Sequence, residues 1–204
     1  TNKTQIPVIS ENGELIDVLT KIDFTKPIID NQVVIFAGGL GSRLRPLTNN
    51  YPKSMLKVGE KPILEIIIEN LLRAGLHKII IALNYKGEII EEHFGNGENW
   101  GCQIFYLREK KKLGTAGALS LLKEKPELPF FVMNADLLTK VNFNHILEFH
   151  NQHNAMMTVC VREYDIDVPY GVIKTKDEYL VSIDEKPKHS FSVNAGIYLI
   201  DPDA

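Results

Sequence analysis

The sequence predicts an α/β fold with a Rossmann-like, mostly parallel sheet, helices on both faces and a small β-hairpin in front. Short apolar runs alternate with segments whose apolar residues recur at helical spacing, in the order strand, helix, strand, helix. One apolar run, Gln32 to Ala37, leads directly into Gly38, Gly39 and Gly41, as a buried strand followed by a tight loop would. The 204 residues, 44% of them hydrophobic, fit one large domain or one domain and a fragment of another.

The first 25 residues read as a separate strand-turn-strand unit. Residues 6–9 and 15–19 are the expected strands, Asn12-Gly13 is a typical hairpin turn, and Thr20 to Asp23 favours a helix start. Strand, turn and strand ending in T-x-x-D resemble the closing half of a CBS motif, a module that senses adenosine nucleotides. We interpret residues 1–25 as a partial CBS motif and 26–31 as a linker to a domain over 32–204; an unrelated hairpin is the alternative.

The glycine stretch has the chemistry of a phosphate-binding loop. Glycines let a ligand approach main-chain N–H groups, and a helix beginning near Ser42 would add partial positive charge. Arg43 supplies a forked donor and Lys53 a point charge on a flexible stem. A dinucleotide fingerprint is excluded because Leu44 stands where its third glycine belongs, and the chain has no P-loop motif. A glycine turn without a ligand is the alternative.

The rest of the chain continues the alternation. Helices are expected at Ile63–Arg73, Glu88–Phe94 and around His145–His153, strands at His77–Leu83, Gln103–Leu107, Pro129–Met133 and Ala155–Val161, and a loop at Asp165–Val168. The charged run Lys110 to Lys112 reads as a solvated surface. Ligands of such sheets bind at the carboxyl ends of the strands, where the glycine loop lies.

Asp136 follows the apolar run that ends at Met133, so it is expected at a strand end facing the phosphate loop. Mg²⁺ prefers one or two carboxylates together with substrate phosphates, which makes Asp136 the candidate metal ligand. A turn or N-cap role is the alternative. The small residues around Gly114 and Thr115 would let a flat ring lie against the backbone, although a ligand-free helix start fits as well.

Composition excludes several classes. A net charge of −3 gives no electrostatic footprint for nucleic acid. No run approaches 18 apolar residues, and the isolated Cys102 and Cys160 suit a reduced, cytoplasmic protein. The spacing of His145, His150 and His153 does not make a zinc triad, so these histidines are expected on the surface or at an interface.

The run Gly38-Gly39-Leu40-Gly41-Ser42-Arg43-Leu44-Arg45-Pro46-Leu47-Thr48, followed by Pro52-Lys53, resembles the signature of the sugar nucleotidyltransferases. The resemblance extends from Gln32 to the end. Segments similar to the family's Y-G-V, E-K-P and N-A-G-I-Y motifs follow in the expected order. This resemblance implies a GT-A-like nucleotidyltransferase fold.

The resemblance also implies the reaction: a sugar-1-phosphate attacks the α-phosphorus of a nucleoside triphosphate with Mg²⁺ as cofactor. Arg43, Lys53 and Asp136 would be the catalytic residues, with Asp136 binding the metal. The expected nucleotide-binding residues are Ala37, Gly38, Gly39, Gly41, Ser42, Arg43, Gly114 and Thr115. The expected sugar-phosphate-binding residues are Tyr170, Gly171, Glu185, Lys186 and Asn194. The family's second metal-binding aspartate lies past Ala204, so the chain reads as truncated at both ends, and weak or absent turnover is expected of this fragment. We further expect a homo-oligomer.

The base and the sugar stay open. The motifs look most like the CBS-linked guanylyltransferases that activate glucosamine-1-phosphate in nonulosonic (legionaminic) acid synthesis, which predicts GTP as the donor. Uridylyl-, thymidylyl- and cytidylyltransferases share most of these motifs. A non-catalytic nucleotide-sugar sensor and a CBS-regulated binding module are hypotheses from other classes.

Overall fold

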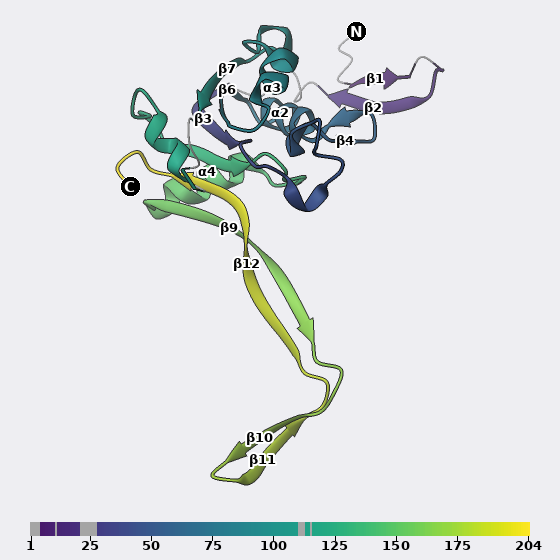
Figure 1. The fold of residues 1–204 in the computed structure, drawn as a ribbon, viewed down its shortest axis with the longest axis vertical. Coiled ribbons are helices and arrows are strands. Elements are labelled where there is room, and N and C mark those ends of the chain that lie inside the picture. The colour runs from purple at the N-terminus through teal and green to yellow at the C-terminus, as the bar shows by residue number, and fades with distance from the viewer. Residues whose placement is uncertain (1–4, 11, 21–27, 110–112, 115) are drawn as a thin grey trace. The chain divides into compact units, whose positions relative to one another are not determined.

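The computed structural model describes residues 5–10, 12–20, 28–109, 113–114 and 116–204. Figure 1 shows the elements in chain order. The strands are β1 Gln5–Ile9, β2 Leu15–Thr20, β3 Ile29–Phe36, β4 Lys57–Val58, β5 Lys61–Pro62, β6 Leu76–Leu83, β7 Gln103–Arg108, β8 Phe130–Asn134, β9 Met157–Asp167, β10 Val172–Lys176, β11 Tyr179–Asp184 and β12 Lys188–Ile200. The α-helices are α2 Ile63–Arg73, α3 Gly87–Phe94 and α4 Phe143–His153, and the 3-10 helices are η1 Ser42–Leu44, η2 Lys53–Met55, η3 Glu98–Trp100 and η4 Gly117–Leu121.

A six-stranded sheet in the order β7-β6-β3-β8-β12-β9 forms the centre of the fold. β3 pairs in parallel with β6 on one side and β8 on the other, and β6 pairs in parallel with β7. The expected α/β class with a mostly parallel sheet is therefore confirmed. The carboxyl ends of β3 and β8 lie side by side because Phe36 is in register with Asn134.

Alternating side chains of the central strands fill two core layers. Val34, Ile80 and Val132 face one side, where Leu119 of η4 packs against them. Val33, Ile79 and Phe131 are fully buried on the other side, where the ring of Phe131 meets Phe143 of α4 edge to face. Both faces of the sheet are thus covered, as predicted.

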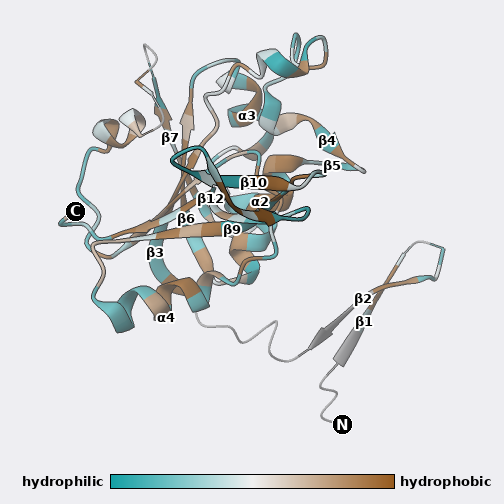
Figure 2. Ribbon diagram, turned by 90° about the horizontal axis from the view of Figure 1, so that it is seen from below, coloured by the Kyte–Doolittle hydropathy of each residue, from teal (hydrophilic) through white to brown (hydrophobic). Residues whose placement is uncertain are grey.

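Helices α2 and α4 form because their apolar residues repeat at helical spacing. The bounds of α2 match the expected range, and its buried side chains are Leu64, Ile67, Ile68 and Leu71. Asn142 caps α4 by accepting hydrogen bonds from the backbone N–H groups of Asn144 and His145. The alternation of hydrophobic and hydrophilic residues along α4 is visible in Figure 2.

The N-terminal segment forms the predicted antiparallel hairpin, with Ile9 paired to Leu15. Gly13 has a φ of 81°, and its backbone N–H donates to the carbonyl oxygen of Ser10. Residues 21–27, which include most of the expected helix start, lie outside the described residues. The interpretation of the hairpin as a partial CBS motif and the domain boundaries stay predictions.

The chain divides into two compact units: Thr1–Thr158 with Tyr198–Ala204, and Val159–Ile197. The second unit contains the hairpin of β10 and β11, in which Ile173 pairs with Ile183. The expected loop at 165–168 was wrong, because β9 runs to Asp167. Asp165 is held there by the hydroxyl of Ser190 and the ammonium of Lys188, at 2.7 and 2.8 Å.

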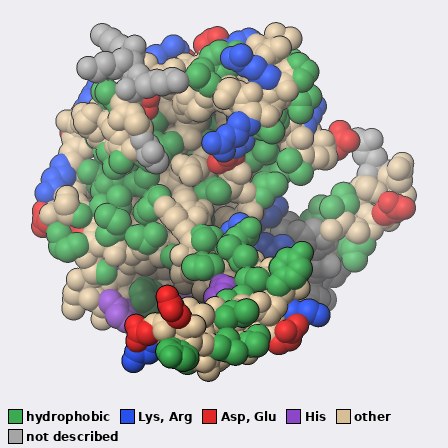
Figure 3. Space-filling model, turned by 60° about the horizontal axis from the view of Figure 1, so that its bottom comes forward, with side chains coloured by type: hydrophobic (Ala, Val, Ile, Leu, Met, Phe, Trp, Pro, Cys, Tyr) green, Lys and Arg blue, Asp and Glu red, His purple; other side chains and the backbone are tan. Residues whose placement is uncertain are grey.

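Figure 3 shows acidic and basic side chains scattered among hydrophobic ones on the face that it draws. Within the described ranges, no helix is long and apolar enough to cross a membrane.

Candidate active site

The candidate site is a pocket of about 610 Å³ at the carboxyl ends of β3 and β8, within the first unit. Its wall comes from four segments: the glycine loop after β3, the start of η2, the chain after β7 and the chain after β8. The residues that line it are Phe36, Ala37, Gly38, Gly39, Leu40, Gly41, Ser42, Arg43, Leu44, Lys53, Ser54, Glu109, Gly114, Asn134, Ala135 and Asp136. All three residues predicted to be catalytic are among them.

The glycine loop is shaped by two close approaches. A Cβ on Gly38 would lie 3.0 Å from the Cβ of Asn84, so the loop runs directly against the turn after β6. Gly41 has a φ of 59°, and a Cβ there would lie 2.7 Å from the methyl of Thr48. The helix expected near Ser42 is only the single 3-10 turn η1. An anion in this loop, which stays a prediction, would therefore be held by main-chain N–H groups and side-chain cations more than by a helix dipole.

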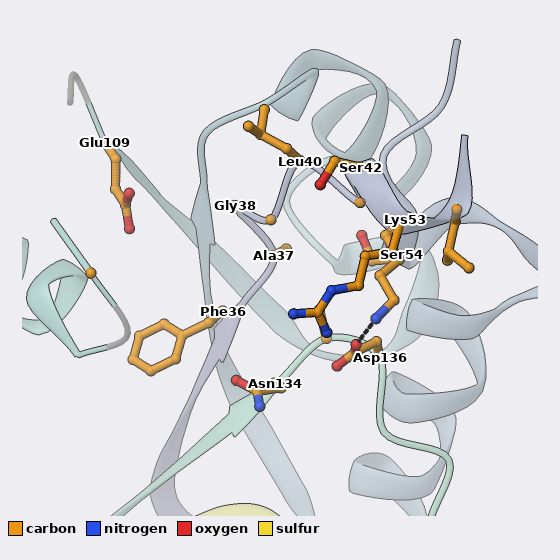
Figure 4. A pocket seen from close by; sticks show the side chains of 16 residues that line it. Phe36, Ala37, Gly38, Leu40, Ser42, Lys53, Ser54, Glu109, Asn134 and Asp136 are labelled. Atoms are coloured by element: carbon orange, nitrogen blue, oxygen red, sulfur yellow. Dashed lines mark hydrogen bonds and ion pairs between the residues drawn. The ribbon is translucent and has the colours of Figure 1, made fainter. Parts of the chain in front are cut away.

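Lys53 and Asp136 form an ion pair between Nζ and Oδ2 on the pocket wall (Figure 4). Their side chains are 39% and 32% exposed, so the pair is partly screened by water and contributes little to stability. The fold thus brings the predicted phosphate cation and the predicted metal ligand together from segments 83 residues apart. Arg43 makes no hydrogen bond or ion pair with any described residue, which leaves its guanidinium available to an anionic ligand.

Glu109 is a pocket residue that the sequence analysis missed. It follows β7 directly, and Asn84 Nδ2 donates to its Oε2 at 3.4 Å. Figure 4 shows Glu109 across the pocket from the Lys53–Asp136 pair, with Ala37 and Gly38 between them. Its position directly after a predicted strand of a parallel sheet is a signal that could have identified it, since ligands bind at such strand ends. The lysines that follow it favour a solvated surface instead.

Ser54 is a second residue that sequence reasoning did not select. Its side chain is 3% exposed, and its hydroxyl has no hydrogen-bond partner among the described residues. Buried polar groups are nearly always paired, so an unpaired hydroxyl beside Lys53 is unusual. No sequence signal distinguishes it from an ordinary core serine.

The predicted base-contact segment is only partly visible. Gly114, with a φ of 85°, lines the pocket. Thr115 lies outside the described residues. Gly117 has no room for a side chain, because a Cβ would lie 2.4 Å from the Cβ of Leu113. Gly114 and Gly117 are thus explained by the local backbone conformation and packing, and contact with a base stays a prediction.

The five residues predicted to bind the sugar phosphate all lie in the second unit. Of these, Gly171 and Glu185 lie together, since a Cβ on Gly171 would stand 3.0 Å from Glu185 Oε2. Asn194 Oδ1 accepts a hydrogen bond from the backbone N–H of Gly196 at 2.8 Å. Tyr170 is 74% exposed and Lys186 has a φ of 46°. The placement of these residues relative to the pocket stays a prediction.

The histidines of α4 differ from the expectation in one case. His150 is buried, at 2% exposure, and its Nδ1 lies 2.8 Å from Thr158 Oγ1. The prediction of a surface or interface position was therefore wrong for His150, which is one of the buried residues of α4. Within the described residues, no group of three or more His, Cys, Asp or Glu side chains could hold a metal.

Comparison with known proteins connects this geometry to one family. The family model described as nucleotidyl transferase matches residues 32–204. A mannose-1-phosphate guanyltransferase of Yarrowia lipolytica is 38% identical over 178 residues, which cover 83% of this chain and 49% of that protein. The corresponding protein of Saccharomyces cerevisiae is 36% identical over 179 residues, 83% of this chain and 50% of its own length. The chain thus spans about half the length of the curated relatives it matches.

Solved structures agree with the sequence comparison. A Bacillus anthracis protein solved with sucrose, provisionally named a glucose-1-phosphate thymidylyltransferase, superposes with a TM-score of 0.67 at 26% identity, covering 84% of this chain and 72% of that one. HddC from Yersinia pseudotuberculosis, complexed with GMP-PN, has a TM-score of 0.63 at 26% identity, covering 85% of this chain and 77% of that one.

Proposed function

This chain belongs to the nucleotidyl transferase family, and we propose that it transfers a nucleotidyl group from a nucleoside triphosphate to a sugar-1-phosphate. The observation that carries the proposal is one glycine-walled pocket that holds Arg43, Lys53 and Asp136 together. Relatives are named for this reaction with mannose-1-phosphate, which supports the substrate class.

In the proposed reaction, an oxygen of the sugar phosphate forms a bond to the α-phosphorus, and the bond from that phosphorus to the bridging oxygen breaks. Pyrophosphate leaves with the electron pair. No protein nucleophile is required, so the protein contributes orientation and charge neutralisation. Arg43 binds the triphosphate and the leaving pyrophosphate, while Lys53 neutralises charge where the two substrates meet.

Asp136 is the residue that would hold Mg²⁺. Its carboxylate is a hard oxygen donor, partly exposed on the wall of the pocket that the glycine loop also lines, which fits a metal completed by substrate phosphates and water. When bound, the metal would neutralise triphosphate charge. Lys53, which pairs with Asp136 in the described state, would then be free to contact phosphate.

GTP is the proposed donor, and the position and hydrogen-bonding capacity of the Glu109 carboxylate support this choice. An ionised carboxylate only accepts hydrogen bonds. On its Watson–Crick edge, guanine presents two adjacent donors, N1–H and the N2 amino group, whereas the other common bases present one donor next to an acceptor. Because Glu109 lies across the pocket from the phosphate-binding cations, a triphosphate bound between them would direct its base toward this carboxylate.

The finer assignments rest on the sequence motifs. We propose glucosamine-1-phosphate as the sugar and the CBS-linked branch of nonulosonic acid synthesis as the subfamily. Lys186 would hold the sugar phosphate, and Tyr170, Gly171, Glu185 and Asn194 would contact the sugar. A cytoplasmic homo-oligomer completes the proposal.

The direct test is the thermal stability of the chain with Mg²⁺ and each of GTP, UTP, CTP, dTTP and ATP. A ligand present at 100 times its dissociation constant stabilises by roughly 2.7 kcal/mol. We expect a shift with GTP and much smaller shifts with the others, and we expect Glu109→Gln to remove the difference. A shift with another base alone would refute the guanylyl assignment, and no shift with any would refute nucleotide binding by this chain.

A further inference from the structure

Two consecutive residues behind the pocket, Asn84 and Tyr85, contact both of its ends. They form the turn between β6 and α3, and neither lines the pocket. Asn84 Nδ2 donates to Oε2 of Glu109 at 3.4 Å, and the Cβ of Asn84 packs against Gly38. Asn84 therefore touches the proposed base-reading carboxylate and the glycine loop at once.

Tyr85 contacts the chain between η1 and η2, which joins the lining residues Leu44 and Lys53. Its hydroxyl lies 3.4 Å from the carbonyl oxygen of Thr48 and 3.2 Å from that of Asn49, and these two acceptors share its single hydrogen. Thr48 is 1% exposed, and its Oγ1 donates to the carbonyl oxygen of Gly41 at 2.9 Å. Tyr85 thus holds the segment that connects Arg43 to Lys53.

We propose that Asn84 and Tyr85 are positioning residues that fix the two ends of the pocket independently, an inference that rests on the proposed function. Asn84 orients the Glu109 carboxylate and so sets the preference for guanine. Tyr85 anchors the loop that presents Arg43 and Lys53, and so sets affinity for the triphosphate whatever its base. One rigid turn thereby keeps the distance between base and phosphate sites constant.

The size of the effects follows from the contact lengths. The contacts of Asn84 and Tyr85, at 3.2 to 3.4 Å, are longer than the usual hydrogen bond, so each contributes less than a short bond to a buried charge would. We expect changes in dissociation constant of about 3- to 10-fold. Effects of a thousandfold would indicate unfolding or direct ligand contact.

The test uses binding calorimetry with three probes: GTP, ITP and inorganic tripolyphosphate. ITP lacks the 2-amino group, so the ratio of ITP to GTP dissociation constants reports on Glu109, and tripolyphosphate reports on the cation end alone. Tyr85→Phe should weaken all three probes equally. Asn84→Ala should lower the ITP-to-GTP ratio and leave tripolyphosphate binding unchanged.

Two further variants control for general damage. Tyr106→Phe removes a hydroxyl that donates to the carbonyl oxygen of Gly95 at 2.7 Å. Neither residue lines the pocket, so this variant should change no probe. Asn84→Asp keeps the packing against Gly38 but replaces the donor with a carboxylate facing Glu109, and should lower the ratio as Asn84→Ala does.

The possible outcomes distinguish failure of the proposed function from failure of the positioning roles alone. If the unchanged chain binds none of the probes, the proposed function fails and this inference fails with it. If it binds GTP and tripolyphosphate but the Asn84 and Tyr85 variants leave every dissociation constant unchanged, the proposed function stands and the positioning roles are refuted. The same holds if Tyr106→Phe weakens every probe as much as Tyr85→Phe does.

Discussion

The hydroxyl of Thr48 donates to the carbonyl oxygen of Gly41 at 2.9 Å, and the methyl of Thr48 lies 2.7 Å from where a Cβ on Gly41 would stand. The two residues therefore close the glycine-rich segment between β3 and η2 on itself. The same hypothetical Cβ would lie 3.2 Å from the Cβ of Lys53, so the start of η2 packs on the glycine as well. Position 41 favours glycine, both for its φ of 59° and for its lack of space.

Gly41→Ala should destabilise the chain by about 1–3 kcal/mol, because alanine is strained at positive φ and its methyl would displace Thr48. Denaturant unfolding measures the change. Gly39→Ala is the matched control, since Gly39 is not at positive φ and a Cβ there would meet no heavy atom within 4 Å. Equal effects of the two variants would show that the loop is not held as described.

Asp136→Asn should leave stability nearly unchanged and abolish turnover. The ion pair with Lys53 is partly exposed, and such pairs contribute about 0–1 kcal/mol. Loss of the carboxylate that would hold the metal should lower pyrophosphate release from GTP and a sugar-1-phosphate by at least about 100-fold.

The same variant separates an enzyme from a sensor. If the chain binds nucleotide-sugars without catalysis, the unchanged chain releases no pyrophosphate and Asp136→Asn keeps its affinity for the nucleotide-sugar. Turnover that survives the substitution would instead remove Asp136 from the proposed metal site.

Thr158→Val should cost about 1–3 kcal/mol, because it removes the partner of a buried imidazole nitrogen. His150 Nδ1 lies 2.8 Å from Thr158 Oγ1, and His150 Nε2 has no partner among the described residues. Thermal unfolding gives the measurement. Thr175→Val serves as control, since Thr175 is exposed and makes no side-chain hydrogen bond with the described residues. A similar loss in both would show that the contact of Thr158 with His150 contributes nothing specific.

Local patterns predicted most of the elements and the cation end of the pocket. The helix Ile63–Arg73 was predicted to the residue because its apolar spacing, and the Ala74-Gly75 that follows it, are local signals. Arg43, Lys53 and Asp136 were predicted to act together from motif order, and the register of β3 with β8 places them in one pocket.

What the sequence could not supply are contacts between distant segments. Glu109 reaches the pocket because β7 pairs with β6. The sequence around Glu109 is a run of charged residues, which indicates only a solvated surface. His150 is buried because Thr158, after the helix, supplies a partner that no helical pattern reveals. The extension of β9 to Asp167 depends on Lys188 and Ser190 across the strand, so local propensity indicated a loop.

Tyr106 should make stability depend on pH in the alkaline range. Burial, with smaller contributions from Glu91 and Cys102, raises the pKa of its phenol from 10.0 to about 12. Between these values the unfolded chain has released a proton that the folded chain still binds. The folded state is therefore favoured fully below pH 10, and this contribution is lost as the pH rises toward 12.

Unfolding midpoints in denaturant across pH 9 to 12 test this, by comparison of the unchanged chain with Tyr106→Phe. The unchanged chain should lose stability more steeply than the variant within the window, because only the unchanged chain carries the phenol whose pKa differs between the two states. Tyr179→Phe is the control, since Tyr179 is 78% exposed and should give the slope of the unchanged chain. Identical slopes for Tyr106→Phe and the unchanged chain would show that the phenol of Tyr106 is hydrated in the folded protein.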